Sequence, residues 1–511
     1  MKSKFRENAR PHPGPPPQER ENYSPISDIG KALGDPMPFR AKTKKAATAK
    51  RQNKLSDGAG SLPLSPGQRA GARASVTHAF LNQAMAALAV LLFACSPASA
   101  ETLWLTGATV HTVSGETIPV GQVLITDGKI SAVGKSVSPG GATPVDLTGL
   151  HLYPGLIALN TELGLVEIGA VRATHDDREV GEFTPEVQSW LAVNPDSELL
   201  PVARANGVAY FEPVPLGALV SGQSGLLALD GWTSEQMTIK KAIALHVFWP
   251  GMRLDTTPKE RAGDPKKWKS LEDQTKEQRE KLKAFEDFFD EARAYAKAKE
   301  AAQVAGAFPK VPAWEAMLPV VRGEVPITVH ADDARQIRAA VKWAEAHHFK
   351  INLAEARDAW RVAGLLAANH IPVIYNHVFT QPASDWDGYD VHFAAPALLQ
   401  KAGVKVVFGL SGDRSSLVKN LPYDAAQAVA FGLPAAEALK GITLYPAQVA
   451  GVADRLGSVE AGKDATLFVA DGDILDIRSN VKRMWIAGQE VSLESRHTRF
   501  YEKYKNRPKI K

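Results

Sequence analysis

The sequence predicts an α/β protein in which a (β/α)8 barrel is joined to a small β domain assembled from both ends of the mature chain. Eight short apolar runs between residues 151 and 450 alternate with segments of helical spacing, a pattern typical of βα units around a parallel sheet. Hairpin-like segments stand on either side of that region. The 511 residues contain one cysteine, which excludes a disulfide framework and a cysteine-based zinc cluster.

The first hundred residues differ in composition from the rest. The whole chain has a net charge of +4, but residues 1–100 hold 15 Lys and Arg against 6 Asp and Glu, so the remainder is mildly acidic, at −5. A nucleic-acid or anionic-membrane partner would favour the opposite sign. Residues 1–75 are rich in Pro, Gly, Ser, Lys and Arg and lack apolar periodicity. We expect them to be a disordered extension or a misassigned start, with a real cytoplasmic extension as the alternative.

Residues 76–100 have the composition of a secretory signal peptide. An apolar run at 84–94 follows two arginines and precedes Ala-Ser-Ala at 98–100. Cleavage there would export the protein to the periplasm with Glu101 as its first residue. The run is too short for a transmembrane segment. A short buried helix is one alternative, and a lipoprotein anchored through Cys95 is another.

Two β-rich pieces flank the barrel, at residues 101–150 and 451–511, and the second also carries a basic tail. Both contain short strands separated by Asp-Gly turns, at 127–128 and 471–472, which is hairpin chemistry. We therefore expect one β domain with strands from both pieces. The predicted strands are 103–105, 122–125, 130–133, 465–470 and 481–487.

Residues 151–450 supply the eight strands that a (β/α)8 barrel requires, in a segment of suitable length for one barrel and an insertion. Helical spacing is clearest at 332–347, 356–369 and 391–402. The predicted strands are 152–159, 208–211, 226–229, 243–247, 325–330, 350–353, 371–375 and 404–408.

The insertion is the highly charged segment 257–305. Its apolar residues recur at helical spacing, which predicts an amphipathic helix packed on the barrel with a solvated charged face. These residues are Leu282, Phe285, Phe289, Ala292 and Tyr295.

Polar residues end many of the predicted strands. In a barrel, chemistry takes place where the strands meet the loops at their carboxyl ends. Histidines and carboxylates that converge there suit a divalent metal or general acid–base catalysis, although any one of the histidines alone is as consistent with a hydrogen-bonded structural role. The residues are Asn160, Glu162, His246, His330, Glu355, His377 and Asp413.

Two segments carry a resemblance to a known family. Residues 153–164, Tyr-Pro-Gly-Leu-Ile-Ala-Leu-Asn-Thr-Glu-Leu-Gly, resemble the first barrel strand of the amidohydrolase superfamily, in particular of the imidazolonepropionase-like metal-dependent hydrolases. Residues 443–447 and 455–467 resemble the segment in which that family leaves the barrel for its β domain. The resemblance covers about 101–500 and implies hydrolysis of non-peptide carbon–nitrogen bonds.

The same resemblance implies that most of the family's metal site is missing. The two histidines of its first strand correspond to Asn160 and Glu162, and its sixth-strand histidine falls near Glu355. Its fifth-strand histidine matches His330. Its eighth-strand aspartate, a metal contact and general base, matches Asp413.

Glu162, His330, Asp413 and Glu355 could still supply oxygen and nitrogen donors to an ion. Because carboxylate-rich sets favour harder ions, any metal should be weakly bound and Mn²⁺ or Mg²⁺ rather than Zn²⁺. The absence of a metal is the alternative.

Candidate substrate-binding residues lie near the strand ends. The loop after the first strand holds Arg172, which suits a carboxylate, and His175. A glycine-rich turn at 221–225 contains Gln223. His377 and Asn160 complete the set. Solvated charges and a simple chain reversal are the competing interpretation of the loop and the turn.

Three functions remain open. The first is an exported amidohydrolase-like enzyme that cleaves a small amide or cyclic amide at an altered metal site, with Asp413 as base and His330 as ligand or oxyanion stabiliser. The second is a non-catalytic member that binds a ligand or partner in the barrel pocket. The third is metal-free chemistry by Glu162 or Glu355 with Asp413, as in glycoside hydrolysis. A small-molecule substrate is the expected partner, and a homo-oligomer is possible.

Overall fold

The computed structural model describes residues 102–217, 219–302, 308–410 and 415–508. The chain divides into two units, Met1–Phe93 and Ala94–Lys511, and every described residue belongs to the second. The predicted extension at 1–75 and signal peptide at 76–100 therefore lie outside the described residues. Within the described part of the chain, no helix has the length and apolar character needed to cross a membrane.

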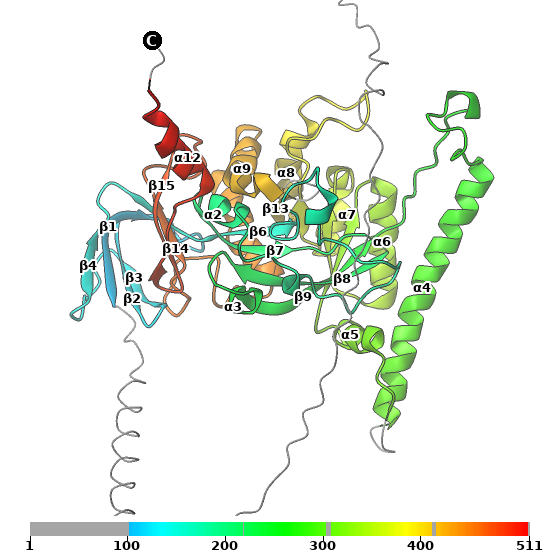
Figure 1. Ribbon diagram of the computed structural model, residues 1–511, viewed down its shortest axis with the longest axis horizontal. Coiled ribbons are helices and arrows are strands. Elements are labelled where there is room, and N and C mark those ends of the chain that lie inside the picture. The colour runs from blue at the N-terminus through cyan, green and yellow to red at the C-terminus, as the bar shows by residue number, and fades with distance from the viewer. Residues whose placement is uncertain (1–101, 218, 303–307, 411–414, 509–511) are drawn as a thin grey trace, which may run out of the picture. The chain divides into compact units, whose positions relative to one another are not determined.

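Both ends of the described chain contribute to one β sheet, as the sequence predicts (Figure 1). Its strand order is β16-β15-β14-β5-β1-β2-β3, and β4 pairs with β1. The turn between β2 and β3 places Asp127 at φ 51° and Gly128 at φ 74°, the left-handed conformation that a two-residue hairpin needs. The strands are β1 (Leu103–Val110), β2 (Ile118–Thr126), β3 (Lys129–Gly134), β4 (Thr143–Asp146), β5 (His151–Pro154), β14 (Leu467–Ala470), β15 (Val481–Ile486) and β16 (Gln489–Glu490).

Eight further strands close into a barrel in the order β10-β11-β12-β13-β6-β7-β8-β9. All eight overlap predicted strands, because each contains a buried apolar run, although the run predicted at 226–229 covers only the last three residues of β8. They are β6 (Leu156–Thr161), β7 (Val208–Pro213), β8 (Val220–Ala228), β9 (Thr238–Phe248), β10 (Ile327–Ala331), β11 (Ile351–Glu355), β12 (Val373–Tyr375) and β13 (Val406–Leu410).

One strand of the barrel departs from the all-parallel prediction. β8 runs antiparallel to both β7 and β9, whereas the other neighbouring pairs are parallel. The cause is the length of the connections. Residues 214–219 and 229–237 join β8 to its neighbours, and parallel strands need a crossover of about a dozen residues or more. The reversal brings the beginning of β8 to the carboxyl ends of the other strands.

The helices of the barrel follow the strands from β9 onward (Figure 1). α6 shows why such a helix forms. The Asp333 side chain accepts from the backbone of Arg335 and Gln336 at its start, and His348 ends it in the left-handed conformation, a combination that satisfies both helix ends. The helices are α2 (Leu199–Arg204), α3 (Ser234–Met237), α4 (Leu271–Ala302), α5 (Pro312–Val321), α6 (Ala334–His347), α7 (Ala363–Ala368), α8 (Val391–Lys401), α9 (Leu421–Ala430), α10 (Ala435–Gly441), α11 (Leu444–Val449) and α12 (Arg496–Lys505).

The charged insertion forms α4, which lies beside α6 (Figure 1). Phe285 and Phe289 are fully buried. Their rings lie 4.9 and 5.0 Å from that of Trp343 on α6, and Phe288 contacts Trp314 on α5. The opposite face is charged. The predicted amphipathic helix is confirmed, and aromatic packing fixes it to the barrel.

Candidate active site

Polar side chains from six neighbouring strands meet at the carboxyl ends of the barrel strands. Five of these side chains are buried, and the sixth, that of Glu355 on β11, is 22% exposed. The end of the cluster at β11 is therefore its contact with solvent. The residues are Asn160 on β6, Glu212 on β7, Ser224 on β8, His246 on β9, His330 on β10 and Glu355 on β11.

The innermost part of the cluster surrounds the Glu212 carboxylate. It accepts hydrogen bonds from the Asn160 backbone N–H at 2.9 Å and from the Ser224 hydroxyl at 2.6 Å. His246 Nε2 lies 2.8 Å from Ser224 Oγ and 3.3 Å from Glu212 Oε1. Burial by itself raises the pKa of Glu212, but hydrogen bonds from His246, Ser224 and the Asn160 backbone N–H hold it below its usual value. Glu212 is therefore ionised.

A row of hydrogen bonds runs outward from Glu212 to Glu355. His246 Nδ1 lies 2.9 Å from His330 Nε2, and His330 Nδ1 lies 3.3 Å from Glu355 Oε1. Burial lowers the pKa of His246, more than Glu212 raises it, so its ring is neutral. We call this row, Glu212–Ser224–His246–His330–Glu355, the buried relay.

The direction of donation along the buried relay follows from the ionised carboxylate. Since Ser224 donates to Glu212, its oxygen accepts from His246 Nε2–H. Neutral His246 then accepts at Nδ1 from His330 Nε2–H. His330 Nδ1 then faces Glu355 Oε1 at 3.3 Å, so an imidazole and a carboxyl group meet at the solvent end of the relay. Such a pair can donate and accept a proton.

Strained backbone holds the solvent end of the relay in place. Asn160, Glu355 and Ala356 have φ of 57°, 66° and 63°, each costing on the order of 1–3 kcal/mol, and such strain gathers at functional sites. Asn160 Nδ2 donates to Glu355 Oε1 at 3.3 Å, and Asn376 Nδ2 donates to Glu355 Oε2. The strand ends thus aim two amides and one imidazole at a single carboxylate.

Of the four predicted metal-binding residues, the structure brings His330 and Glu355 together. Glu162 is buried directly after β6. Asp413 lies outside the described residues, so its place relative to the other three is an open prediction.

The remaining predicted substrate-binding residues form hydrogen bonds with groups other than Glu355 or are exposed. His377 Nε2 pairs with Asp332 Oδ1 at 2.8 Å. His175 Nε2 lies within 3.3 Å of the carbonyls of its own loop, and Arg172 is exposed at the start of a short 3-10 helix, Arg172–Thr174. Gln223 donates to the carbonyls of residues 185 and 316.

The predicted glycine-rich turn at 221–225 is wrong. These residues are the buried first half of β8. A Cβ on Gly222 would lie 2.7 Å from the backbone carbonyl oxygen of Val187, so the glycine allows close packing of the preceding loop rather than a chain reversal.

Sequence reasoning missed Glu212 and Ser224 as site residues. Both stand within fully buried strands. A carboxylate inside an apolar strand is costly unless its partners satisfy it, and that was the available signal. It predicts a partner but does not say which residue supplies it.

The described residues do not fit the family's zinc site. A histidine ligand needs a free ring nitrogen, and both nitrogens of His330 already face hydrogen-bond partners. The first-strand positions offer Asn160, a poor zinc ligand, and Glu162. Across the residues that the structure describes, no three His, Cys, Asp or Glu side chains are grouped to hold an ion.

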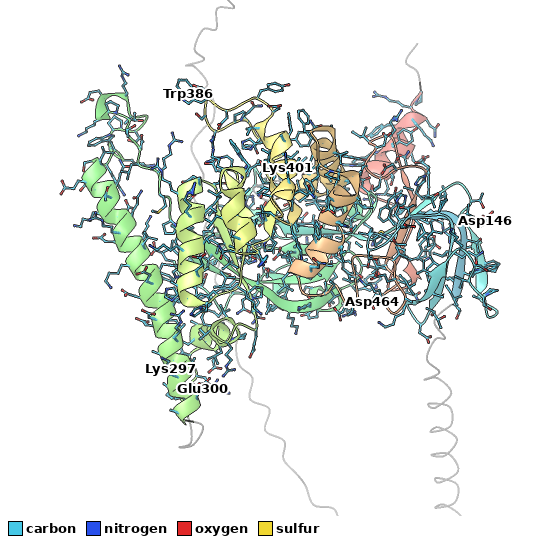
Figure 2. All side chains as sticks on the ribbon, turned by 180° about the vertical axis from the view of Figure 1, so that it is seen from behind. Asp146, Lys297, Glu300, Trp386, Lys401 and Asp464 are labelled. Carbon is cyan, nitrogen blue, oxygen red and sulfur yellow. The ribbon has the colours of Figure 1, made fainter. Side chains whose placement is uncertain are left out.

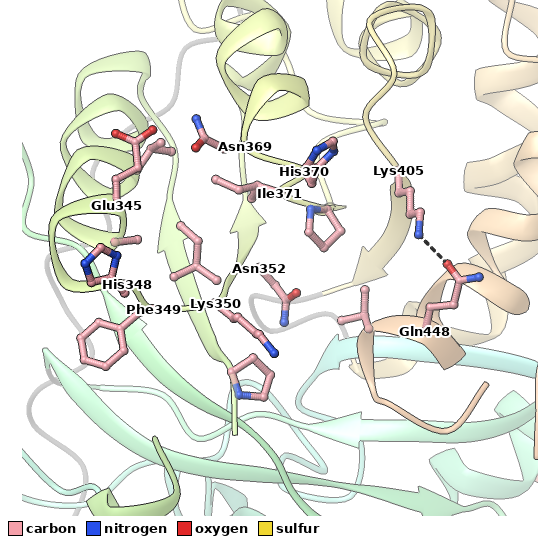
Figure 3. A pocket seen from close by; sticks show the side chains of 16 residues that line it. Glu345, His348, Phe349, Lys350, Asn352, Asn369, His370, Ile371, Lys405 and Gln448 are labelled. Atoms are coloured by element: carbon pink, nitrogen blue, oxygen red, sulfur yellow. Dashed lines mark hydrogen bonds between the residues drawn. The ribbon is translucent and has the colours of Figure 1, made fainter. Parts of the chain in front are cut away.

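A cavity of about 600 Å³ lies at the opposite end of the barrel (Figure 3). Its walls come from residues that precede or begin β10 to β13, such as Lys350, Ile371 and Lys405. This amino-terminal end of a barrel serves stability rather than chemistry. We therefore place the candidate active site at Glu355.

Three comparisons relate the chain to known proteins. The model of the amidohydrolase family matches residues 238–491. An amidohydrolase structure from Thermotoga maritima is 27% identical, with a TM-score of 0.67, over 76% of this chain and 99% of the other. An adenosine deaminase structure from Xanthomonas campestris with bound zinc is 15% identical, with a TM-score of 0.43, over 77% and 93%.

A curated protein of Hapsidospora irregularis, amidohydrolase tasK, is 25% identical over 186 residues. The match covers 34% of this chain and 18% of that protein. The chain thus spans about a fifth of the length of this relative.

Proposed function

Because this chain belongs to the amidohydrolase superfamily, we propose that it hydrolyses a carbon–nitrogen bond in a small amide or cyclic amide. The observation that carries the proposal is the buried relay, which ends at a partly exposed carboxylate in contact with the His330 imidazole. It lies where barrel enzymes hold their reactive groups.

The reaction needs a base for water and an acid for the departing nitrogen. Glu355 takes a proton as the water oxygen attacks the carbonyl carbon, and it returns that proton to nitrogen as the C–N bond breaks. The products are a carboxylate and a protonated amine, which together contain both protons of the water. The buried relay keeps the His330 ring oriented with Nδ1 toward Glu355.

Asp413 is the second carboxylate of the proposal. It matches the family's general base and follows β13, the barrel neighbour of β6 and β12. In this arrangement Asp413 orients or deprotonates the water together with Glu355. Any metal would be held weakly by the oxygens of Glu162, Glu355 and Asp413 and would be Mn²⁺ or Mg²⁺ rather than Zn²⁺.

The test is amine release from a panel of small N-acyl amino acids and cyclic amides by the full chain, with and without added Mn²⁺. Glu355→Gln should lower kcat by roughly 10²–10⁴-fold, the usual contribution of acid–base catalysis. Glu345→Gln, an exposed glutamate at the opposite barrel end (Figure 3), is the matched control. Asp413→Asn should also be inactive. Wild-type rates in Glu355→Gln would overturn the proposal.

A non-catalytic, ligand-binding role is the second candidate. The observation that favours it is that both ring nitrogens of His330 are already occupied by hydrogen bonds. Tight binding of a panel compound by the wild-type chain without any amine release would support this role against hydrolysis.

Export is a separate proposal that rests on residues 76–100 alone. We expect a periplasmic protein whose first residue is Glu101. Amino-terminal sequencing of the mature protein tests it, and an acylated Cys95 or an intact Met1 would contradict it.

A further inference from the structure

A second cavity, of about 560 Å³, opens at the same end of the barrel as Glu355. Its walls are the segments that follow β10, β11 and β12, together with Arg253 after β9. Arg357 stands two residues beyond Glu355. The volume is within the range of small-molecule sites. We call it the arginine cavity because four arginines line it: Arg253, Arg335, Arg357 and Arg361.

The carboxylates of the arginine cavity are mostly engaged. Asp333 caps α6. Asp358 accepts from the Ala334 backbone at 3.3 Å, and Asp387 pairs with Arg361. Asp385 is exposed to water. The four aspartates equal the four arginines in number, but only Arg361 lies within salt-bridge distance of any of them.

Three of the arginines form no salt bridge within the described ranges of the chain, although Arg357 lies near the Asp332 carboxylate, which accepts from its backbone N–H at 3.3 Å. Arg253, Arg335 and Arg357 form no salt bridge there, and the buried Nε of Arg357 has no hydrogen-bond acceptor among those residues. A buried donor without an acceptor is costly, on the order of 1–3 kcal/mol. A guanidinium matches the two oxygens of a carboxylate in geometry and charge.

An aromatic surface adjoins the arginines. Trp386 lines the arginine cavity on the loop between β12 and α8 and is 95% exposed (Figure 2). A large exposed aromatic side chain beside a polar cavity offers a stacking face to a ligand.

We propose that the arginine cavity binds the carboxylate of an acidic amide whose body carries an aromatic or apolar group. Arg357 holds the carboxylate, Arg335 and Arg253 add positive charge, and Trp386 covers the apolar part. This inference rests on the proposed function, because the scissile amide would then lie toward Glu355. It narrows the substrate class to N-acyl or N-aroyl amino acids and related acids.

The test is equilibrium binding of N-benzoylglycine and of its neutral counterpart, N-benzoylglycinamide, to the full chain by calorimetry. The acid should bind roughly 10- to 100-fold more tightly, the worth of charge-assisted hydrogen bonds. Arg357→Gln should remove most of that preference. Trp386→Ala should lower the affinity for both compounds by about 2- to 10-fold.

Arg335→Gln and Arg338→Gln form a matched pair on α6, since both residues are exposed and only Arg335 lines the arginine cavity. Arg335→Gln should weaken binding of the acid, and Arg338→Gln should not. This pair keeps the proposal testable even if Arg357→Gln fails to fold. Equal affinity for acid and amide, equal effects of the α6 pair, or tighter binding of inorganic phosphate than of the acid would overturn it.

Binding requires no turnover, so the result is independent of catalysis. If the chain binds the acid but hydrolyses none of the compounds, the proposed binding role of the arginine cavity is supported and the proposed hydrolase activity is contradicted. If the chain hydrolyses neutral amides with no preference for acids, the hydrolase activity is supported and the binding role of the arginine cavity is contradicted.

Discussion

The chemistry available at the contact between His330 and Glu355 depends on residues deeper in the barrel. Taken alone it is a 3.3 Å contact between a histidine and a carboxylate. The ionised Glu212, three strands from His330 in the barrel, influences which way each intervening group donates. The environment of Glu355 thus depends on a residue that lies deeper in the barrel.

Ser224 is the residue at which the buried relay can be tested without removing a charge. Ser224→Ala leaves Glu212 short of one donor and His246 short of one acceptor, both buried. We expect a loss of about 1–3 kcal/mol in the free energy of unfolding, measured with urea. Ser136→Ala, at an exposed position in the bend after β3, should change it by less than about 0.5 kcal/mol. Equal effects would mean that the relay is not formed.

At the scale of single elements, α4 shows how an insertion is attached to a barrel. Phe289 contributes the most central ring, in contact with Phe285, Phe288, Trp343 and Phe349. Its removal would leave a cavity between α4 and α6.

Phe289→Ala should therefore destabilise the protein by about 3–5 kcal/mol. Leu271→Ala, at the exposed start of the same helix, serves as the control and should cost less than about 1 kcal/mol. Urea unfolding followed by tryptophan fluorescence measures both. A small effect of Phe289→Ala would show that α4 is only loosely held.

The packing of α8 on β12 should depend on pH. His392 on α8 is buried, and its Nδ1 lies 2.8 Å from the Tyr375 hydroxyl. Burial first, and then the positive charges of His377 and Arg357, lower the pKa of His392 to about 4. In the unfolded chain it titrates near 6.5.

Between those two values the unfolded chain binds a proton that the folded chain does not. Stability should then fall as pH decreases from about 6.5 toward 4, by about 1.4 kcal/mol per pH unit from this group. His392→Gln should flatten the pH dependence of the unfolding free energy relative to wild type. His497→Gln, exposed on α12, should leave it unchanged. Parallel curves for wild type and His392→Gln would contradict the assignment.

For the molecule as a whole, the sequence located the strands better than it located the site. Apolar runs reveal where a strand lies, because each segment must supply its own apolar side chains to be buried. The reversed direction of β8 depends on connection lengths, which the short predicted run at 226–229 concealed. The Asp-Gly turn at 127–128 was predictable, because only the local backbone decides it.

The site was predicted in part for the same reason. His330 and Glu355 stand at strand ends and were found by position. Glu212 and Ser224 act through cross-strand neighbours, and no local pattern encodes which strands adjoin or in what register. The arginine cavity likewise joins segments that follow four different strands and is visible only in the folded chain.

The central claim is that a hydrogen-bonded relay ending at Glu355 occupies the place of the superfamily's zinc centre. The most direct measurement is the metal content of the purified full chain, by elemental analysis, after expression with added Zn²⁺ and Mn²⁺ and dialysis against a chelator. Because His330 and Glu355 are already in contact with each other and Asn160 is a poor ligand, we predict far less than one ion of either metal per chain. Stoichiometric zinc that survives the chelator would contradict the account.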